Sequence, residues 1–284
     1  MRPKCFDDYE EERRRQTPEQ IDLILHEARR WDLAPVLQGG GVIVFAHTFL
    51  SACASGIAAA VHAALDSGSD RVLALGVMHA TNQKRLEARI VEQQSIKGSH
   101  LDLRGVYGPD LPGAEELFHE YSLLSFLFLW HEEIKRRGCK PPKLYCRYPF
   151  LVNRSPETLL GMKELEEIAN DAVIVATSDF CHHGAAYGAP PDACLEIGSD
   201  ALSFAKSCVS RHLHLLETAS YDDFYAHCLE IKSDSFDVST VVKYLRAPFQ
   251  TELLDISLVD TSSLYDTRPV PSWVAASLVV FNSK

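Results

Sequence analysis

The chain has 284 residues, of which 46% are hydrophobic, and its formal net charge is −11, from 28 Lys and Arg against 39 Asp and Glu. This length suits one large α/β domain, and the hydrophobic content is sufficient for a sizeable core. The acidic balance argues against nucleic acid or an anionic membrane surface as the main partner, and no apolar run approaches the roughly 20 residues that span a bilayer.

The charged segment Met1–Gln16 lacks the apolar region of a signal peptide. Its run Glu10–Arg15 is expected to be a solvated charged face at a frayed end. A helix is predicted to begin at Thr17, because a proline follows in the first helical position and Gln20 completes a capping box. Residues 1–38 are therefore expected to form an N-terminal charged segment and helix, and residues 39–284 the main domain.

Short apolar strands alternate with helices through the rest of the chain. This alternation predicts a largely parallel or mixed central sheet with helices on both faces, in a single α/β domain. Residues 80–113 are mostly polar with scattered Gly and Pro, and they are predicted to form a long irregular excursion. Strands are expected at residues 42–46, 71–77, 143–152, 172–176, 253–259 and 274–281, and helices at residues 55–65, 115–137, 156–170, 192–217, 221–231 and 238–245.

The eight cysteines are spread along the chain without CxxC pairs. This pattern favours buried free thiols in a reducing cytoplasm over a zinc ribbon.

Three of the buried strands run directly into polar residues. One ends at His47, another at His79, and the third enters a loop that contains Asp179 and His182. The carboxyl ends of parallel strands meet at one edge of a sheet, where ligands of α/β proteins bind. A single histidine is more often a core or surface residue. The shared placement predicts that imidazoles converge on one metal ion, for which iron, copper and zinc are suitable.

Residues Ser178–Gly184 read SDFCHHG, which resembles the S-D-F-C-H-W-G signature of the Memo-like family. Phe45–Thr48 is similar to the family's P-H-A-G, Leu75–Ala80 to its L-G-P-S-H-H, and Glu120–Leu123 stands where the family has E-H-S-I-E. The order of these segments holds over about residues 40–282. The resemblance implies a fold related to the class III extradiol dioxygenases, which hold iron(II) with two histidines and a carboxylate and use a further histidine as acid/base.

By this resemblance His47 and His79 are the two metal imidazoles, and Asp179 and His182 are the neighbouring polar pair. An Asp three residues before a His can contact it in a turn and fix its tautomer, so that His182 acts as general acid/base. The alternative is that Asp179 is a turn or cap residue. Cys181 is expected to be buried rather than nucleophilic.

The third ligand of the family is a cysteine in a C-G-R-H-P stretch, and this cysteine is absent here. Ser233 falls nearest to its place, with Asp234 one residue on and Asp237 three further. A carboxylate at Asp234 would complete a two-His, one-carboxylate site, which suits non-heme iron(II). The alternative is that Asp234 caps the helix that begins near Phe236.

The predicted function is that of a non-heme metal protein acting on a small molecule, with Fe(II) expected first and copper or zinc as alternatives. An O₂-dependent oxidoreductase of the dioxygenase type is the leading hypothesis. The alternatives are a non-catalytic metal- or peptide-binding scaffold, which the lost cysteine favours, and a metal-assisted hydrolase or lyase using zinc-bound water. A cytoplasmic location is expected, and a homodimer is left open together with the substrate.

Overall fold

The computed structural model of the chain describes residues 4–79, 82–94, 100–152 and 155–284. Its strands are β1 (Val42–Phe45), β2 (Arg71–Leu75), β3 (Gly105–Tyr107), β4 (Lys143–Phe150), β5 (Val173–Thr177), β6 (His182–Gly184), β7 (Phe249–Asp260) and β8 (Ser272–Ser283). Its α-helices are α1 (Lys4–Arg14), α2 (Pro18–Glu27), α3 (Ala34–Gln38), α4 (Leu50–Asp66), α5 (Gln83–Gln93), α6 (Leu124–Arg137), α7 (Met162–Asp171), α8 (Ser199–Thr218), α9 (Tyr221–Glu230) and α10 (Phe236–Arg246). None of the helices in the described residues combines the length and apolar character needed to cross a membrane.

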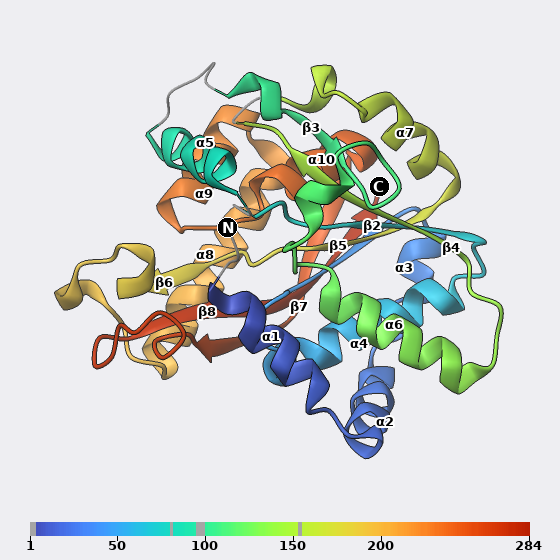
Figure 1. Cartoon of the computed structure of the whole chain (residues 1–284), viewed down its shortest axis with the longest axis horizontal. Coiled ribbons are helices and arrows are strands. Elements are labelled where there is room, and N and C mark those ends of the chain that lie inside the picture. The colour runs from blue at the N-terminus through green and yellow to red at the C-terminus, as the bar shows by residue number, and fades with distance from the viewer. Residues whose placement is uncertain (1–3, 80–81, 95–99, 153–154) are drawn as a thin grey trace.

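The strands form one mixed sheet in the order β3-β4-β2-β5-β1-β8-β6, and β7 pairs with β8 (Figure 1). β4, β2, β5 and β1 are parallel neighbours. β3, β6, β7 and β8 join them in antiparallel pairs. β1, β2 after Arg71 and β5 before Thr177 are continuously apolar because both of their faces are covered. The predicted single α/β domain with a mixed sheet is confirmed.

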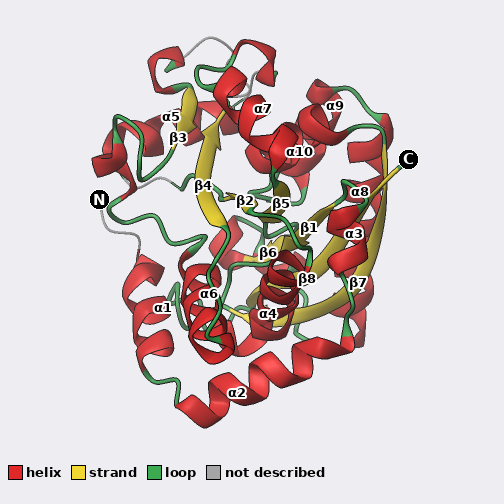
Figure 2. Cartoon of the chain, turned by 90° about the vertical axis from the view of Figure 1, so that its right-hand side faces the viewer, coloured by secondary structure: helices red, strands yellow, loops and turns green. Residues whose placement is uncertain are grey.

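Helices cover both faces of this sheet. In β1, Ile43 and Phe45 belong to a core cluster with residues of α2, α4 and α6. Val42 and Val44 belong to a second cluster with residues of α7, α8, α9 and α10. Figure 2 shows α4 and α6 below the strands and α7 and α10 above them. The alternation of side chains along a strand therefore divides the core into two layers.

The N-terminal segment packs on the domain. α2 begins at the predicted capping box, where the Gln20 amide N donates to Thr17 Oγ1 (3.3 Å) and the Thr17 amide N donates to Gln20 Oε1 (2.8 Å). The expectation of a frayed end is wrong, because the run lies in α1 as far as Arg14, whereas Glu11, Arg14 and Arg15 are exposed as expected of a solvated charged face. The Glu12 carboxylate accepts hydrogen bonds from the amides of Leu50 (2.6 Å) and Ser51 (2.9 Å). Glu12 thus caps α4, whose own N-cap residue is a phenylalanine.

The predicted irregular excursion over residues 80–113 is wrong in its described part, while residues 80–81 and 95–99 lie outside the described residues. It contains α5, which Asn82 caps by accepting a hydrogen bond from the Arg85 amide (2.9 Å). It also contains β3. The buried positions of α5 include Arg85, Ala88 and Glu92, of which two are charged. The buried face of α5 is therefore not the one that its apolar residues would mark, since Ile90 of the same helix is 46% exposed.

Several predicted boundaries are also corrected. The helix expected over residues 115–137 begins only at Leu124, after a 3₁₀ turn at Ala114–Leu117. The helix expected over residues 192–217 begins at Ser199. The free thiols of Cys53, Cys146, Cys181 and Cys228 are buried as expected, whereas Cys139 is exposed.

Candidate metal site

The carboxyl ends of β1, β5 and β2 lie together. Phe45 at the end of β1 is paired with Thr177 of β5, and Leu75 at the end of β2 is paired with Ala176. His47 follows β1 and His79 follows β2, and their Nε2 atoms are 3.3 Å apart. The two imidazoles that the sequence places at separate strand ends therefore face one point.

Asp234 reaches the same point from the loop between α9 and α10. Its Oδ2 lies 3.2 Å from His47 Nε2 and 3.9 Å from His79 Nε2. Its Oδ1 accepts a hydrogen bond from the Asp179 amide (2.9 Å), which fixes the carboxylate toward the histidines. The N-cap residue of α10 is Ser235, and no side chain caps it. Asp234 therefore does not cap α10.

The two other residues considered for the third ligand lie elsewhere. Ser233 Oγ is 3.2 Å from the carbonyl oxygen of Asp179. Asp237 accepts hydrogen bonds from Arg89 Nη2 (2.5 Å) and from the Leu151 amide (3.2 Å). A carboxylate occupied in this way is not available to the histidines.

Both histidines are held in the tautomer that leaves Nε2 free. The Thr177 hydroxyl donates its proton to the Phe45 carbonyl oxygen (2.9 Å). Thr177 Oγ1 must therefore accept the hydrogen bond from His47 Nδ1, at 2.9 Å. His79 Nδ1 donates to Glu120 Oε1, also at 2.9 Å. Each Nε2 is then the ring nitrogen directed at Asp234 and at the other histidine, where it can hold either a proton or a metal ion.

Glu120 is the residue of the site to which the sequence assigned no role. Its Oε1 accepts from His79 Nδ1 (2.9 Å), from the Tyr121 amide (2.8 Å) and from the Ser122 amide (2.9 Å). Its Oε2 accepts from the His79 amide (2.6 Å). A glutamate in a turn gives no periodic signal, so only the resemblance of the Glu120–Leu123 string pointed to this segment.

His182 and Asp179 lie beside the first three residues. Ligand atoms of Asp179, His182 and Asp234 are all within 4.8 Å of one another. His182 Nδ1 donates to the Lys232 carbonyl oxygen (2.6 Å), whereas Asp179 Oδ1 accepts from the His47 amide (3.1 Å). His182 is therefore oriented by the Lys232 carbonyl oxygen, whereas the sequence predicts that Asp179 orients it.

Without a metal ion, the carboxylates of the site favour a protonated His47. Burial lowers the pKa of His47, but Asp179 and Asp234 outweigh burial and raise that pKa to about 9. Burial raises the pKa of Asp234, but His47, His182 and His79 outweigh burial and hold it well below its usual range. Burial raises the pKa of Asp179, and Asp234 adds to this rise while His47 opposes it.

The donor atoms of His47, His79 and Asp234 fit a metal ion. Two ligand atoms about 2.1 Å from one metal, at angles of 90–110°, lie roughly 3.0–3.4 Å apart. The observed separations of 3.3 Å between the Nε2 atoms and 3.2 Å from His47 Nε2 to Asp234 Oδ2 match this range, and the 3.9 Å from His79 Nε2 to Asp234 Oδ2 is wider. Two imidazoles and a carboxylate form a donor set that leaves positions open for exogenous ligands.

Two cavities open onto this cluster. One, of about 610 Å³, is lined by His79 and Asp234. The other, of about 170 Å³, is lined by His47, His79, Asp179, His182 and Asp234 and by four tyrosines. The Tyr121 ring stacks on His79 with 4.1 Å between centroids, and the Tyr187 ring lies 4.7 Å from His182. Aromatic rings therefore surround the mouth of the site.

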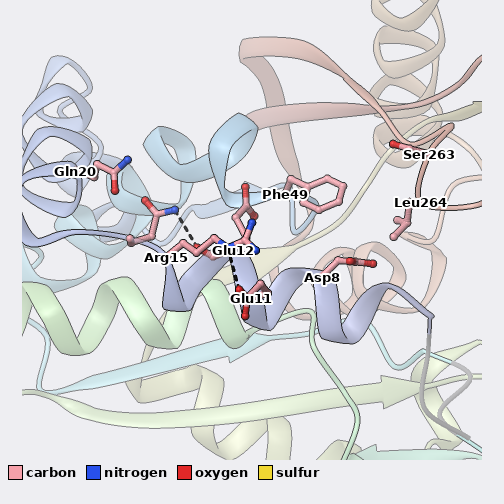
Figure 3. A pocket seen from close by; sticks show the side chains of 9 residues that line it. Asp8, Glu11, Glu12, Arg15, Gln20, Phe49, Ser263 and Leu264 are labelled. Carbon is pink, nitrogen blue, oxygen red and sulfur yellow. Dashed lines mark hydrogen bonds and ion pairs between the residues drawn. The ribbon is translucent and has the colours of Figure 1, made fainter.

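A third cavity, of about 670 Å³, lies on α1 and shares no lining residue with the other two (Figure 3). Asp8, Glu11, Glu12 and Arg15 line it from the α1 side, opposite Phe49 and Leu264. Its Arg15 is paired with Glu11, and its Glu12 caps α4. Two of its charged side chains are thus engaged in contacts that stabilise α1 and α4.

No protein-family model matches the chain, and no curated protein matches it.

Proposed function

We propose that the chain is a Memo-like non-heme metal protein, and that it uses iron(II) in an O₂-dependent oxidation of a small molecule. The observation that carries the proposal is the convergence of His47 Nε2, His79 Nε2 and Asp234 Oδ2, which lie within 4.8 Å of one another. The resemblance of residues 178–184 to the Memo-like signature supports it. A set of two histidines and one carboxylate is the arrangement typical of non-heme iron(II) oxygenases.

In this proposal iron(II), when bound, supplies electrons to O₂, and the residues of the chain supply position and proton transfer. Thr177 and Glu120 hold the two imidazoles through Nδ1, which keeps both Nε2 atoms directed at the metal. His182 donates through Nδ1 to a carbonyl oxygen, so its Nε2 is free to exchange a proton with substrate. Asp179 adds a buried carboxylate beside His47 and Asp234.

Metal analysis of protein purified without oxygen tests the proposal. We expect one iron per chain, or stoichiometric uptake on titration. His47→Ala and Asp234→Ala should each weaken uptake by more than the roughly 10–100-fold that changes around a metal site cost. His131→Ala, at an exposed position on α6, is the matched control and should bind metal like the wild type. Absence of iron, copper and zinc together with no uptake on titration would refute the metal site.

A metal-assisted hydrolase or lyase is the second candidate, because His182 and Asp179 could serve a zinc-bound water with the same ligands. Oxygen consumption during turnover separates the two candidates. Turnover that continues unchanged without oxygen would favour the hydrolase or lyase, whereas retained ligand binding by metal-free His47→Ala would favour a scaffold.

A further inference from the structure

Lys232 occupies a backbone position where a lysine is unfavourable. It follows the C-cap of α9, and its φ of 56° is in the left-handed region. The Ser233 amide donates to the Cys228 carbonyl oxygen (2.9 Å), which closes a Schellman-type turn. Glycine is the usual residue at this place, because it has no Cβ to strain. A lysine whose backbone is held in this strained conformation suggests that its side chain has a functional role.

The backbone of Lys232 is tied to the candidate metal site. Its carbonyl oxygen accepts the hydrogen bond from His182 Nδ1 (2.6 Å), and Asp234 is two residues on. Lys232, an exposed residue, lines both the cavity of about 610 Å³ that contains His79 and Asp234 and the cavity of about 170 Å³ that contains His47 and His182. Lys232 therefore stands where the two cavities meet.

The other cation of the larger cavity is already neutralised. Arg89 pairs with Asp237 (2.5 Å) and with Glu92 (2.9 Å). No salt bridge or side-chain hydrogen bond of Lys232 occurs within the part of the chain that the structure describes. Lys232 is therefore the positive group of this cavity that remains available to a ligand.

The remaining wall of the larger cavity is largely apolar. Val77, Met78, Leu229 and Phe236 line it. The Tyr225 hydroxyl, which also belongs to this wall, donates to the Glu92 carbonyl oxygen (2.9 Å). The cavity thus combines an apolar wall, one unpaired cation, and the histidine–carboxylate cluster at its border.

We propose that Lys232 binds the anionic group of the small molecule that this site accepts, and that this molecule joins a carboxylate or phosphate to an apolar body. The inference rests on the proposed function, in which the larger cavity serves the metal site. The net charge of −11 disfavours general attraction of anions. Anion binding must then be local and must depend on this one ammonium group.

The test compares anion binding by the full-length wild type and the Lys232→Met variant, each in metal-free form, by calorimetry. Benzoate and inorganic phosphate are the probes, and benzamide is the neutral match of benzoate. We expect Lys232→Met to weaken binding of benzoate, phosphate or both by about two- to fivefold, and Lys232→Arg to retain it. Benzamide should bind both proteins equally. Lys206→Met, at an exposed position on α8, is the control and should behave like the wild type.

Preference for benzoate over phosphate would assign the ligand as an organic carboxylate, and the reverse preference would assign a phosphate. Equal binding by the wild type and Lys232→Met, or no anion binding by the wild type up to tens of millimolar, overturns the inference. A separate zinc or iron(II) titration should give the same affinity for Lys232→Met and the wild type. Failure of that titration in the wild type refutes the metal site, whereas failure of the anion comparison refutes only the role of Lys232.

Discussion

Replacing Glu120 with glutamine tests whether the hydrogen-bond acceptor of His79 Nδ1 contributes to metal affinity. The Glu120 side chain is 1% exposed and accepts four hydrogen bonds. Three of the donors point at Oε1 and one at Oε2. A glutamine can place its oxygen toward the three donors, but its NH₂ group then faces the His79 amide, which is 2.6 Å from Oε2 in the wild type.

The magnitude follows from this geometry. The substitution removes one charge-assisted hydrogen bond and leaves a buried N–H group unpaired, so we expect a loss of about 2–4 kcal/mol in the free energy of unfolding. The opposite amide orientation would be worse, because three donors would face the NH₂ group. Metal affinity should fall by roughly 10–100-fold, since His79 Nδ1 then donates to a neutral amide oxygen and the imidazole becomes a weaker ligand.

Urea unfolding and metal titration of Glu120→Gln measure the two effects. Glu115→Gln, an exposed change five residues earlier, is the control and should alter neither. A Glu120→Gln protein with the unfolding midpoint and the metal affinity of the wild type would refute the reasoning, because the four hydrogen bonds would then contribute nothing.

Three further predictions concern the third metal ligand, stability in acid and stabilisation by added metal. Asp237→Asn should destabilise the fold by roughly 3 kcal/mol in urea unfolding, because it breaks a buried ion pair with Arg89. The variant should bind metal with the affinity of the wild type. A loss of metal affinity would contradict the assignment of Asp234 as the third ligand. Burial raises the pKa of Glu133, but Arg136 and Arg137 outweigh burial and lower that pKa to about 2, against 4.5 for a free glutamate. The ionised Glu133 therefore stabilises the fold above pH 4.5, and this stabilisation is lost as the pH falls toward 2. Glu133→Gln should lower the free energy of unfolding by roughly 1–3 kcal/mol at pH 7 and by progressively less at acid pH. A difference in unfolding free energy that does not change with pH would contradict this prediction. Zinc or iron(II) at 100 times its dissociation constant should stabilise the wild type by about 2.7 kcal/mol in thermal unfolding and should not stabilise His47→Ala; equal shifts would show that the metal binds elsewhere.

The sequence predicts the two imidazoles because their positions depend on local patterns. A buried parallel strand is a continuous apolar run, and the residue at its end is visible in the sequence. His47 and His79 each follow such a run, and the order β2-β5-β1 places both beside the end of β5. The fold class and most of the central strands are predictable for the same reason.

The environment of the histidines is not predictable in this way, because it depends on contacts between distant segments. Glu120 lies in a turn before α6, 41 residues from His79. α5 buries the charged side chains of Arg85 and Glu92 and exposes Ile90. The prediction that Asp179 orients His182 depended on a spacing of three residues. His182 Nδ1 instead donates to the carbonyl oxygen of Lys232, which is 50 residues away. Local spacing allows a contact, and tertiary packing decides which contact forms.

The position of Asp234 shows how tertiary packing selects one carboxylate among neighbours. Ser233 Oγ lies 2.8 Å from Ser235 Oγ, and His212 Nε2 of α8 lies 3.0 Å from the same hydroxyl oxygen. Burial lowers the pKa of His212 to about 3, and His227 adds to this effect, so His212 is a neutral hydrogen-bonding partner. With the residues on both sides held in this way and the Asp179 amide bound to Oδ1, the second oxygen of Asp234 has the histidines as its neighbours. An aspartate at this position offers a hard oxygen donor where the Memo-like pattern has a soft thiolate, and this exchange favours iron(II) over copper(I) in the proposed site.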